Sequence, residues 1–207
     1  GYGGKIYALA KLEEAESISR DLVLQMKGEW VEAFNDPYVI AGQGTVALEL
    51  LSQVNDLDVI LGPIGGGGLV SGVSLAAHGV SSKIQIYACE PAGALDAMYS
   101  VQKNQIVPQN HPQTIAEGLR TSVGSLTLPI LREHLAGFFV VEEEEIVQAM
   151  RFVYERIKLI IEPASAVAIA PLLRQERALQ NKRVGVIISG GNVDVSTYFK
   201  NILDHMR

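Results

Sequence analysis

Four consecutive glycines, Gly65 to Gly68, stand directly between a short apolar segment and a segment with helical periodicity. Residues 58–62 (DVILG) contain β-branched and aliphatic side chains, which is typical of a short buried strand. Residues 69–78 then carry apolar side chains at helical spacing. The order of strand, glycine loop and helix predicts one unit of a parallel α/β sheet.

The same alternation continues along the chain. We expect further strands at residues 5–9, 83–89, 138–141 and 183–188. We expect helices at residues 11–27, 42–53, 91–102, 162–174 and 194–203, and one that starts in the Glu-rich segment 142–145. Residues 35–37 (NDP) predict a turn. Strands separated by helices predict an α/β fold with a doubly wound, mostly parallel sheet, helices on both faces, and ligands at the carboxyl ends of the strands.

Composition excludes several classes of function. Seventeen basic residues against 23 acidic ones give a net charge of −6, and they form no basic stripe of the kind that nucleic acid or an anionic membrane binds. The apolar stretches end well short of the roughly 20 residues that span a bilayer. A single cysteine, Cys89, excludes an internal disulfide framework and a Cys-rich zinc site. No charged-then-apolar leader opens the chain, so we expect a cytoplasmic protein.

The four glycines suit a phosphate group, because they present successive backbone N–H groups at a helix N-terminus without side chains in the way. Neither the dinucleotide spacing G-x-G-x-x-G nor a P-loop Gly-Lys-Ser/Thr follows. A tight turn is the alternative, but it explains one or two glycines rather than four. Residues 189–192 (SGGN) follow another apolar strand, so Ser189 is expected to reach the same crevice, although alone they are also typical of a generic turn.

Five segments together resemble a known family: residues 41–45 (AGQGT), 65–68 (GGGG), 116–118 (AEG), 161–164 (IEPA) and 189–194 (SGGNVD). In this order and spacing they resemble the serine racemase and threonine dehydratase group of fold-type II pyridoxal phosphate enzymes, over essentially the whole chain. The resemblance implies the tryptophan synthase β-like fold. It also implies cofactor contacts by Gly65, Gly66, Gly67, Gly68 and Leu69 (phosphate), Gly118 (backbone), Glu162 (near the ring) and Ser189 (pyridine nitrogen).

The implied role of Ser189 bears on the reaction. A serine hydroxyl does not stabilise a pyridinium as a carboxylate does, so the ring nitrogen is expected to stay neutral, which suits elimination and racemisation better than transamination. The resemblance implies a pyridoxal-phosphate-dependent ammonia-lyase that converts L-threonine or L-serine to a 2-oxo acid and ammonia. Serine racemisation and a non-catalytic cofactor-binding or phosphate-binding paralogue are the alternatives.

A second resemblance concerns a metal. The pattern Glu90-Pro91-x-x-Ala94-x-Asp96 resembles the divalent-cation site of the serine-racemase-like branch, with two carboxylates and the Ala94 carbonyl as ligands. Oxygen ligands of this kind suit Mg²⁺ or Ca²⁺. Spacing alone favours the simpler interpretation, a helix N-terminus with acidic residues.

The chain departs from the family in one respect. The family's Schiff-base lysine lies in a Ser-x-Lys segment near the start of the full enzyme, and none of the eight lysines here lies in such a segment. No catalytic residue is therefore identifiable, and we expect a fragment that is inactive alone. We expect residues 1–45 to be a remnant of the smaller domain and 46–207 the large cofactor-binding domain, without a C-terminal regulatory domain. The family suggests a homodimer, unless the chain needs its missing N-terminal segment as a partner.

Overall fold

The structure is a computed structural model that describes Tyr7 and residues 12–204. It divides into two compact units, residues 1–32 and 33–207. The first unit contains helix α1 (Leu12–Gln25), which confirms the helix predicted over residues 11–27. The strand predicted at 5–9 lies outside the described residues except for Tyr7. The domain limits implied by the resemblance, 1–45 and 46–207, stay a prediction.

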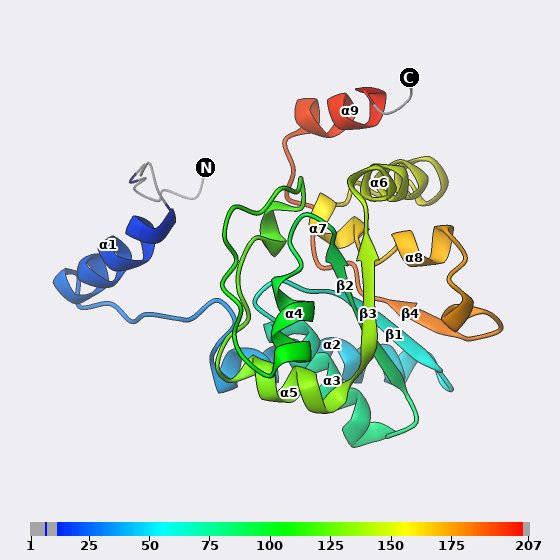
Figure 1. Cartoon of the computed structure of the whole chain (residues 1–207), viewed down its shortest axis with the longest axis horizontal. Coiled ribbons are helices and arrows are strands. Elements are labelled where there is room, and N and C mark those ends of the chain that lie inside the picture. The colour runs from blue at the N-terminus through cyan, green and yellow to red at the C-terminus, as the bar shows by residue number, and fades with distance from the viewer. Residues whose placement is uncertain (1–6, 8–11, 205–207) are drawn as a thin grey trace. The chain divides into compact units, whose positions relative to one another are not determined.

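A four-stranded parallel sheet forms the centre of the second unit, in the order β3-β2-β1-β4 (Figure 1). The strands are β1 (Val59–Pro63), β2 (Gln85–Pro91), β3 (Leu135–Val141) and β4 (Val184–Val186). A strand was predicted at each of these places, and the parallel sheet between helices confirms the predicted fold class. Val59 in β1 is paired with Gln85 on one side and with Val184 on the other.

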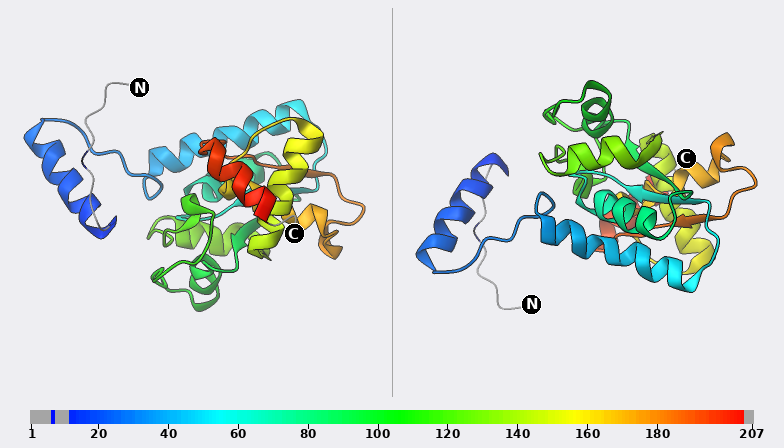
Figure 2. Two further views of the ribbon diagram at one scale, coloured as in Figure 1. Left: turned by 90° about the horizontal axis from the view of Figure 1, so that it is seen from above. Right: turned by 90° about the horizontal axis from the view of Figure 1, so that it is seen from below.

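Helices cover both faces of this sheet (Figures 1 and 2). One layer contains α2 (Pro37–Gln53), α3 (Gly68–Val80), α4 (Asp96–Lys103) and α5 (Thr127–His134). The other contains α6 (Glu143–Ile157), α7 (Pro163–Ala166), α8 (Ala170–Leu173) and α9 (Val195–Asp204). Alternate residues of β1 point into different cores, Ile60 toward the first layer and Val59 and Leu61 toward the second. Within the described residues, no helix is both long enough and apolar enough to cross a bilayer.

The segment Asn35-Asp36-Pro37 is not the turn that we predicted. It starts α2, because Asp36 is the N-cap and Pro37 the first helical residue. The Asp36 carboxylate accepts hydrogen bonds from the N–H groups of Tyr38 (2.8 Å) and Val39 (3.1 Å). Proline suits this first position since its missing N–H has no acceptor there. The helix predicted at 42–53 therefore begins five residues earlier.

The Ala-rich helix predicted at 162–174 is wrong as a single element, because it is broken into α7 and α8. Pro171 has no N–H to donate to the carbonyl of Val167, which interrupts the helical ladder. Helix α5 was not predicted. Its Pro129 lies in the first turn, where a backbone N–H has no acceptor within the helix. The helix predicted at 91–102 begins only at Asp96, since β2 runs on to Pro91.

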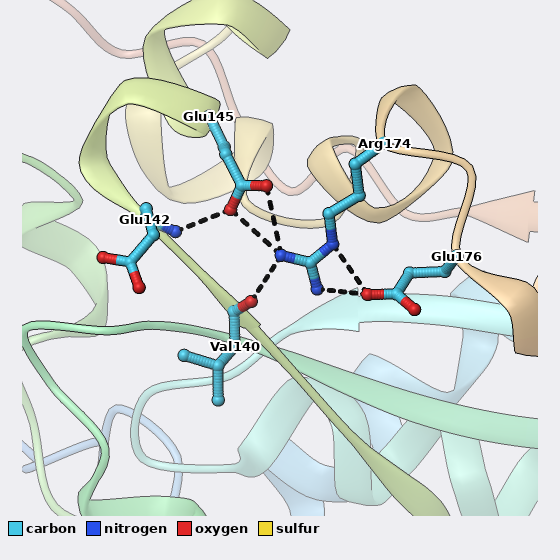
Figure 3. Close-up of polar contacts among 5 residues, drawn as sticks. All are labelled: Val140, Glu142, Glu145, Arg174 and Glu176. Carbon is cyan, nitrogen blue, oxygen red and sulfur yellow. Dashed lines mark hydrogen bonds and ion pairs between the residues drawn. The ribbon is translucent and has the colours of Figure 1, made fainter.

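An arginine at the end of α8 joins a strand of the sheet to two helices of the second layer (Figure 3). The Arg174 guanidinium donates to the Val140 carbonyl (2.8 Å), to Glu145 Oε2 (3.0 Å) and to Glu176 Oε1 (2.7 Å). Glu145 Oε2 also accepts a hydrogen bond from the Glu142 N–H (2.8 Å), as part of the capping box that starts α6. These contacts hold the end of β3, the start of α6 and the end of α8 together.

Candidate functional site

A cavity of about 320 Å³ lies at the carboxyl ends of β1 and β4. The strand order reverses between these neighbours, because β2 and β3 follow β1 on one side whereas β4 returns on the other. Parallel α/β sheets leave a ligand crevice at such a reversal. The volume also falls within the range of about 300–1,000 Å³ that is usual for small-molecule sites.

The cavity brings together all eight residues to which the sequence analysis assigned cofactor contacts: Gly65, Gly66, Gly67, Gly68, Leu69, Gly118, Glu162 and Ser189. Their individual roles remain predictions. Sequence reasoning missed other lining residues, among them Phe34, Gln43 and Thr121. Gln43 lies inside the segment AGQGT that contributed to the resemblance, so a signal existed for it, whereas none marked Phe34 or Thr121.

The glycine loop has no room for side chains. A Cβ atom on Gly66 would lie 2.4 Å from the Phe34 ring, and one on Gly67 would lie 2.8 Å from Leu131 Cδ1. Gly67 also has a φ of +89°, a left-handed backbone conformation that residues other than glycine rarely adopt. Thr127, the first residue of α5, contacts the loop from beneath. The loop therefore presents its backbone to the cavity.

Helix α3 begins at this loop with an uncapped N-terminus. Its N-cap is Gly67, and no side chain forms a capping hydrogen bond there. The first N–H groups of a helix have no acceptors within the helix. Together with the positive end of the helix dipole they form a binding site for an anion such as phosphate.

The second glycine turn forms another wall of the cavity and packs against Glu162. The Glu162 N–H donates to the Gly190 carbonyl (3.1 Å), and Glu162 Oε2 accepts from the Asn192 N–H (3.2 Å). A Cβ atom on Gly190 would lie only 2.9 Å from Glu162 Oε1. The Ser189 hydroxyl contacts that of Ser165 (3.0 Å), a residue that the sequence analysis did not single out.

These residues fit pyridoxal phosphate. A Cβ atom on any glycine of the loop would press against neighbouring protein atoms, so the loop offers only its backbone to the cavity, and the uncapped start of α3 matches a dianionic phosphate. Ser189 supplies a neutral hydroxyl to the same cavity, and a neutral hydroxyl suits an uncharged pyridine nitrogen.

The predicted metal ligands do not line this cavity: Glu90 lies near the end of β2, and Ala94 and Asp96 follow that strand. Glu90 is 1% exposed, and its two carboxylate oxygens accept hydrogen bonds from the N–H groups of Ala97 (2.8 Å) and Met98 (3.0 Å). Asp96 Oδ1 accepts from Gln109 Nε2 (2.7 Å). The buried Asp96 Oδ2 has no hydrogen-bond partner of normal geometry among the described residues.

Burial raises the pKa of both carboxyl groups. The pKa of Glu90 rises to about 8, against the opposing effect of the two N–H donors and with a further increase from the charge of Asp96. The pKa of Asp96 rises to about 6, although the Gln109 hydrogen bond opposes this shift. A cation between two such groups would favour their charged forms.

Among the residues that the structure describes, no cluster of three or more His, Cys, Asp or Glu side chains is placed to hold a metal ion. The cation site therefore stays a prediction.

Comparison with known protein families gives one matching family. The model of the family described as "Pyridoxal-phosphate dependent enzyme" matches residues 1–190. This match includes both glycine turns of the cavity up to Gly190.

Individual relatives agree with that match. The chain is 46% identical over 207 residues to a serine racemase of Dictyostelium discoideum, covering 97% of this chain and 63% of the relative. It is 40% identical over 200 residues to an L-threo-3-hydroxyaspartate ammonia-lyase of Saccharomyces cerevisiae, covering 96% of this chain and 61% of the relative. The structure of maize serine racemase superposes with a TM-score of 0.88 at 39% identity, covering 97% of this chain and 64% of that one. The chain thus spans somewhat less than two thirds of these proteins.

Proposed function

The chain belongs to the family of pyridoxal-phosphate dependent enzymes, and we propose that it is the cofactor-binding part of an ammonia-lyase for L-threonine or L-serine. The reaction is a β-elimination that yields a 2-oxo acid and ammonia. One observation carries the proposal: the eight residues with implied cofactor contacts line a single cavity at the reversal of strand order. The relative named a hydroxyaspartate ammonia-lyase supports elimination from a 3-hydroxy amino acid.

Racemisation of serine is the second candidate, because several relatives are named serine racemases. Both reactions begin with loss of the substrate α-proton. They diverge afterwards, since elimination expels the β-hydroxyl whereas racemisation returns a proton to the opposite face. A non-catalytic paralogue that binds the cofactor is a further alternative, in accordance with the predicted absence of the Schiff-base lysine from the chain.

In this proposal the residues of the cavity divide the work of binding. The N–H groups of Gly65 to Leu69 bind the phosphate, aided by the dipole of α3. The Ser189 hydroxyl donates a hydrogen bond to the ring nitrogen, and its proton stays on the serine oxygen, so the nitrogen remains neutral. Glu162 holds the second glycine turn in place beside the ring. Pyridoxal phosphate, when bound, supplies an electron sink for the charge that develops at the substrate α-carbon.

We further propose that Glu90, Asp96 and the Ala94 carbonyl bind Mg²⁺ or Ca²⁺, with water completing the shell. Two observations support this assignment. The carboxyl groups are buried close enough for the charge of Asp96 to raise the pKa of Glu90, and Asp96 Oδ2 is a buried oxygen without a normal hydrogen bond in the described structure. A divalent cation would balance the charges of the two buried carboxylates and would give Asp96 Oδ2 a partner.

The test starts from the endogenous protein, because the relatives extend beyond the region that the chain matches. Borohydride reduction followed by peptide mapping detects a pyridoxyl-lysine. The protein is then assayed for 2-oxo acid from L-serine and L-threonine, and for D-serine, each with and without Mg²⁺. Formation of 2-oxo acid supports the lyase. Formation of D-serine without any 2-oxo acid would instead support the racemase and contradict the proposed lyase activity.

A different conclusion follows if the endogenous protein consists of only these 207 residues and carries no lysine adduct. If it binds pyridoxine 5′-phosphate, the non-catalytic alternative holds. If it binds none, the cofactor-binding function itself is refuted. Pyridoxine 5′-phosphate is the appropriate probe because it has no aldehyde and cannot react with surface lysines.

A further inference from the structure

A buried serine behind the second glycine turn makes three hydrogen-bond contacts. Ser165 is 0% exposed and lies in α7, directly after the segment that contains Glu162. Its Oγ accepts a hydrogen bond from the Gly190 N–H (2.8 Å), lies 2.8 Å from the Gly190 carbonyl oxygen, and lies 3.0 Å from Ser189 Oγ. A hydroxyl has one proton and two lone pairs, so two arrangements make the contact between Ser165 and Ser189 a hydrogen bond.

In the first arrangement Ser165 donates to the Gly190 carbonyl. Its second lone pair then accepts the proton of Ser189, because its first is occupied by the Gly190 N–H. The Ser189 hydroxyl in that case presents only lone pairs to the cavity. A neutral pyridine nitrogen is itself an acceptor, so this arrangement repels it and suits only a protonated ring.

In the second arrangement Ser165 donates to Ser189 Oγ instead. The Ser189 proton is then free to point into the cavity and to bond a neutral ring nitrogen. The Gly190 carbonyl is not left unsatisfied, because it also accepts from the Glu162 N–H at 3.1 Å. The Gly190 N–H donates to Ser165 in both arrangements. The two therefore differ by rotation of hydroxyl protons alone, without any change in the positions of heavy atoms.

We propose that Ser165 is a positioning residue that turns the Ser189 hydroxyl proton toward the ring nitrogen of the cofactor. This inference rests on the proposed function of the cavity, and it adds a residue to which the resemblance assigns no role. With cofactor present, the hydrogen bonds run from Ser165 to Ser189 and from Ser189 to the ring nitrogen. Hydrogen bonds in such a chain polarise and strengthen one another.

The test uses two probes that differ in a single atom of the ring. One is pyridoxine 5′-phosphate, and the other is its 1-deaza analogue, in which C–H replaces the ring nitrogen. The dissociation constant of each is measured by titration calorimetry with the 207-residue chain. The variants are Ser165→Ala, Ser189→Ala and the double variant. Ser74→Ala serves as the matched control, since Ser74 is a buried serine of α3 whose hydroxyl donates to the Val70 carbonyl of the same helix.

The proposal predicts that Ser165→Ala weakens binding of pyridoxine 5′-phosphate by about threefold to tenfold, the usual effect of one hydrogen bond, and leaves the affinity for the deaza analogue unchanged. In the Ser189→Ala background, removal of the Ser165 hydroxyl has no further effect. Ser74→Ala binds both probes as the wild type does. With the cofactor ring labelled with ¹⁵N, Ser165→Ala moves the ring-nitrogen resonance toward that of an unbonded pyridine.

Equal weakening of both probes by Ser165→Ala would overturn the proposal, because it would show that Ser165 only maintains the shape of the turn. Unchanged binding of both probes would overturn it as well. Failure of the proposed function has a different signature. In that case the wild-type chain binds neither probe, whereas failure of the Ser165 inference leaves wild-type binding intact.

Discussion

The Thr127 hydroxyl donates a hydrogen bond of 2.8 Å to the carbonyl oxygen of Gly66. Thr127 is fully buried, and its Oγ1 also accepts a hydrogen bond from the Gly124 N–H (2.8 Å). The side chain therefore satisfies a carbonyl of the glycine loop and an N–H of the segment before α5. Through this contact helix α5, which was not predicted from the sequence, supports the proposed phosphate site.

Replacing Thr127 with valine tests this support. Thr127→Val keeps the shape of the side chain but leaves the Gly66 carbonyl and the Gly124 N–H without that partner. We expect the free energy of unfolding to fall by about 1–3 kcal/mol, and the affinity for pyridoxine 5′-phosphate to fall with it. Urea unfolding and calorimetric titration measure the two effects. Thr127→Ser retains the hydroxyl and should restore probe binding; equal binding by all three proteins would refute the role.

The glycine loop should not accept alanine. Gly67→Ala would force a side chain onto a residue with a φ of +89° and against Leu131. We expect at least a tenfold loss of affinity for pyridoxine 5′-phosphate, because the displaced N–H groups no longer converge on the phosphate. The control is Gly79→Ala near the end of α3, where a Cβ atom has no neighbour within 4 Å. That variant should bind the probe normally and gain stability of up to about 1 kcal/mol.

Burial of Glu90 and Asp96 predicts a pH dependence of stability in the absence of divalent cations. Both pKa values lie above those of the unfolded chain, about 8 against 4.5 and about 6 against 3.8. The folded state therefore binds these protons more tightly, and the stabilisation is complete below about pH 4. It is lost as the pH rises through about 6 for Asp96 and about 8 for Glu90. Urea unfolding with EDTA at pH 5 to 8 measures this loss, and Asp96→Asn should reduce its slope whereas the exposed Glu144→Gln should not.

Magnesium should reverse this trend if the proposed cation site exists. A cation binds the ionised carboxylates, so the increase in melting temperature caused by MgCl₂ should be larger at pH 8 than at pH 5.5. Asp96→Asn removes one ligand charge and should abolish most of the increase. A cation effect of the same size in wild type and Asp96→Asn would assign it elsewhere on the protein.

Arg174 should contribute more to stability than an ordinary surface arginine (Figure 3). Its side chain is 29% exposed, and its guanidinium bonds a carbonyl and two carboxylates, so we expect Arg174→Ala to cost about 1–3 kcal/mol. Arg151→Ala is the control, because Arg151 has one exposed pair with Glu155 and pairs of that kind contribute about 0.5 kcal/mol or less. Urea unfolding compares the two; equal losses would contradict the predicted role of the Arg174 contacts.

The strands were the most predictable part of the fold. Residues such as Val59, Ile60 and Leu61 form apolar runs that are too short for helices, and both sheet faces are buried. Helix ends were less predictable, because one residue type serves two purposes: Asp36 and Pro37 form helix starts as readily as turns. The failed prediction of one helix over residues 162–174 follows from Pro171, a break that the alanine content of the segment concealed.

The candidate site divides in the same way. The glycine loop was predictable from local sequence, because no other residue type meets its backbone and space requirements. The contact of Ser165 with Ser189 was not, since only the folded sheet brings these residues together. The contact of Phe34 with the glycine loop was likewise not predictable, because Phe34 packs against Gly66 from a distant part of the sequence.

The pairing of β4 with β1 also determines when the cavity can form. One wall follows β1 and the other follows β4, and the last bond between them runs from the Ile187 N–H to the Leu61 carbonyl. A chain emerging from the ribosome therefore has its glycine loop early but no complete pocket until residues 184–189 have left the exit tunnel. Such long-range pairing is slow, and a cofactor that binds only the paired sheet pulls the final folding step to completion by mass action.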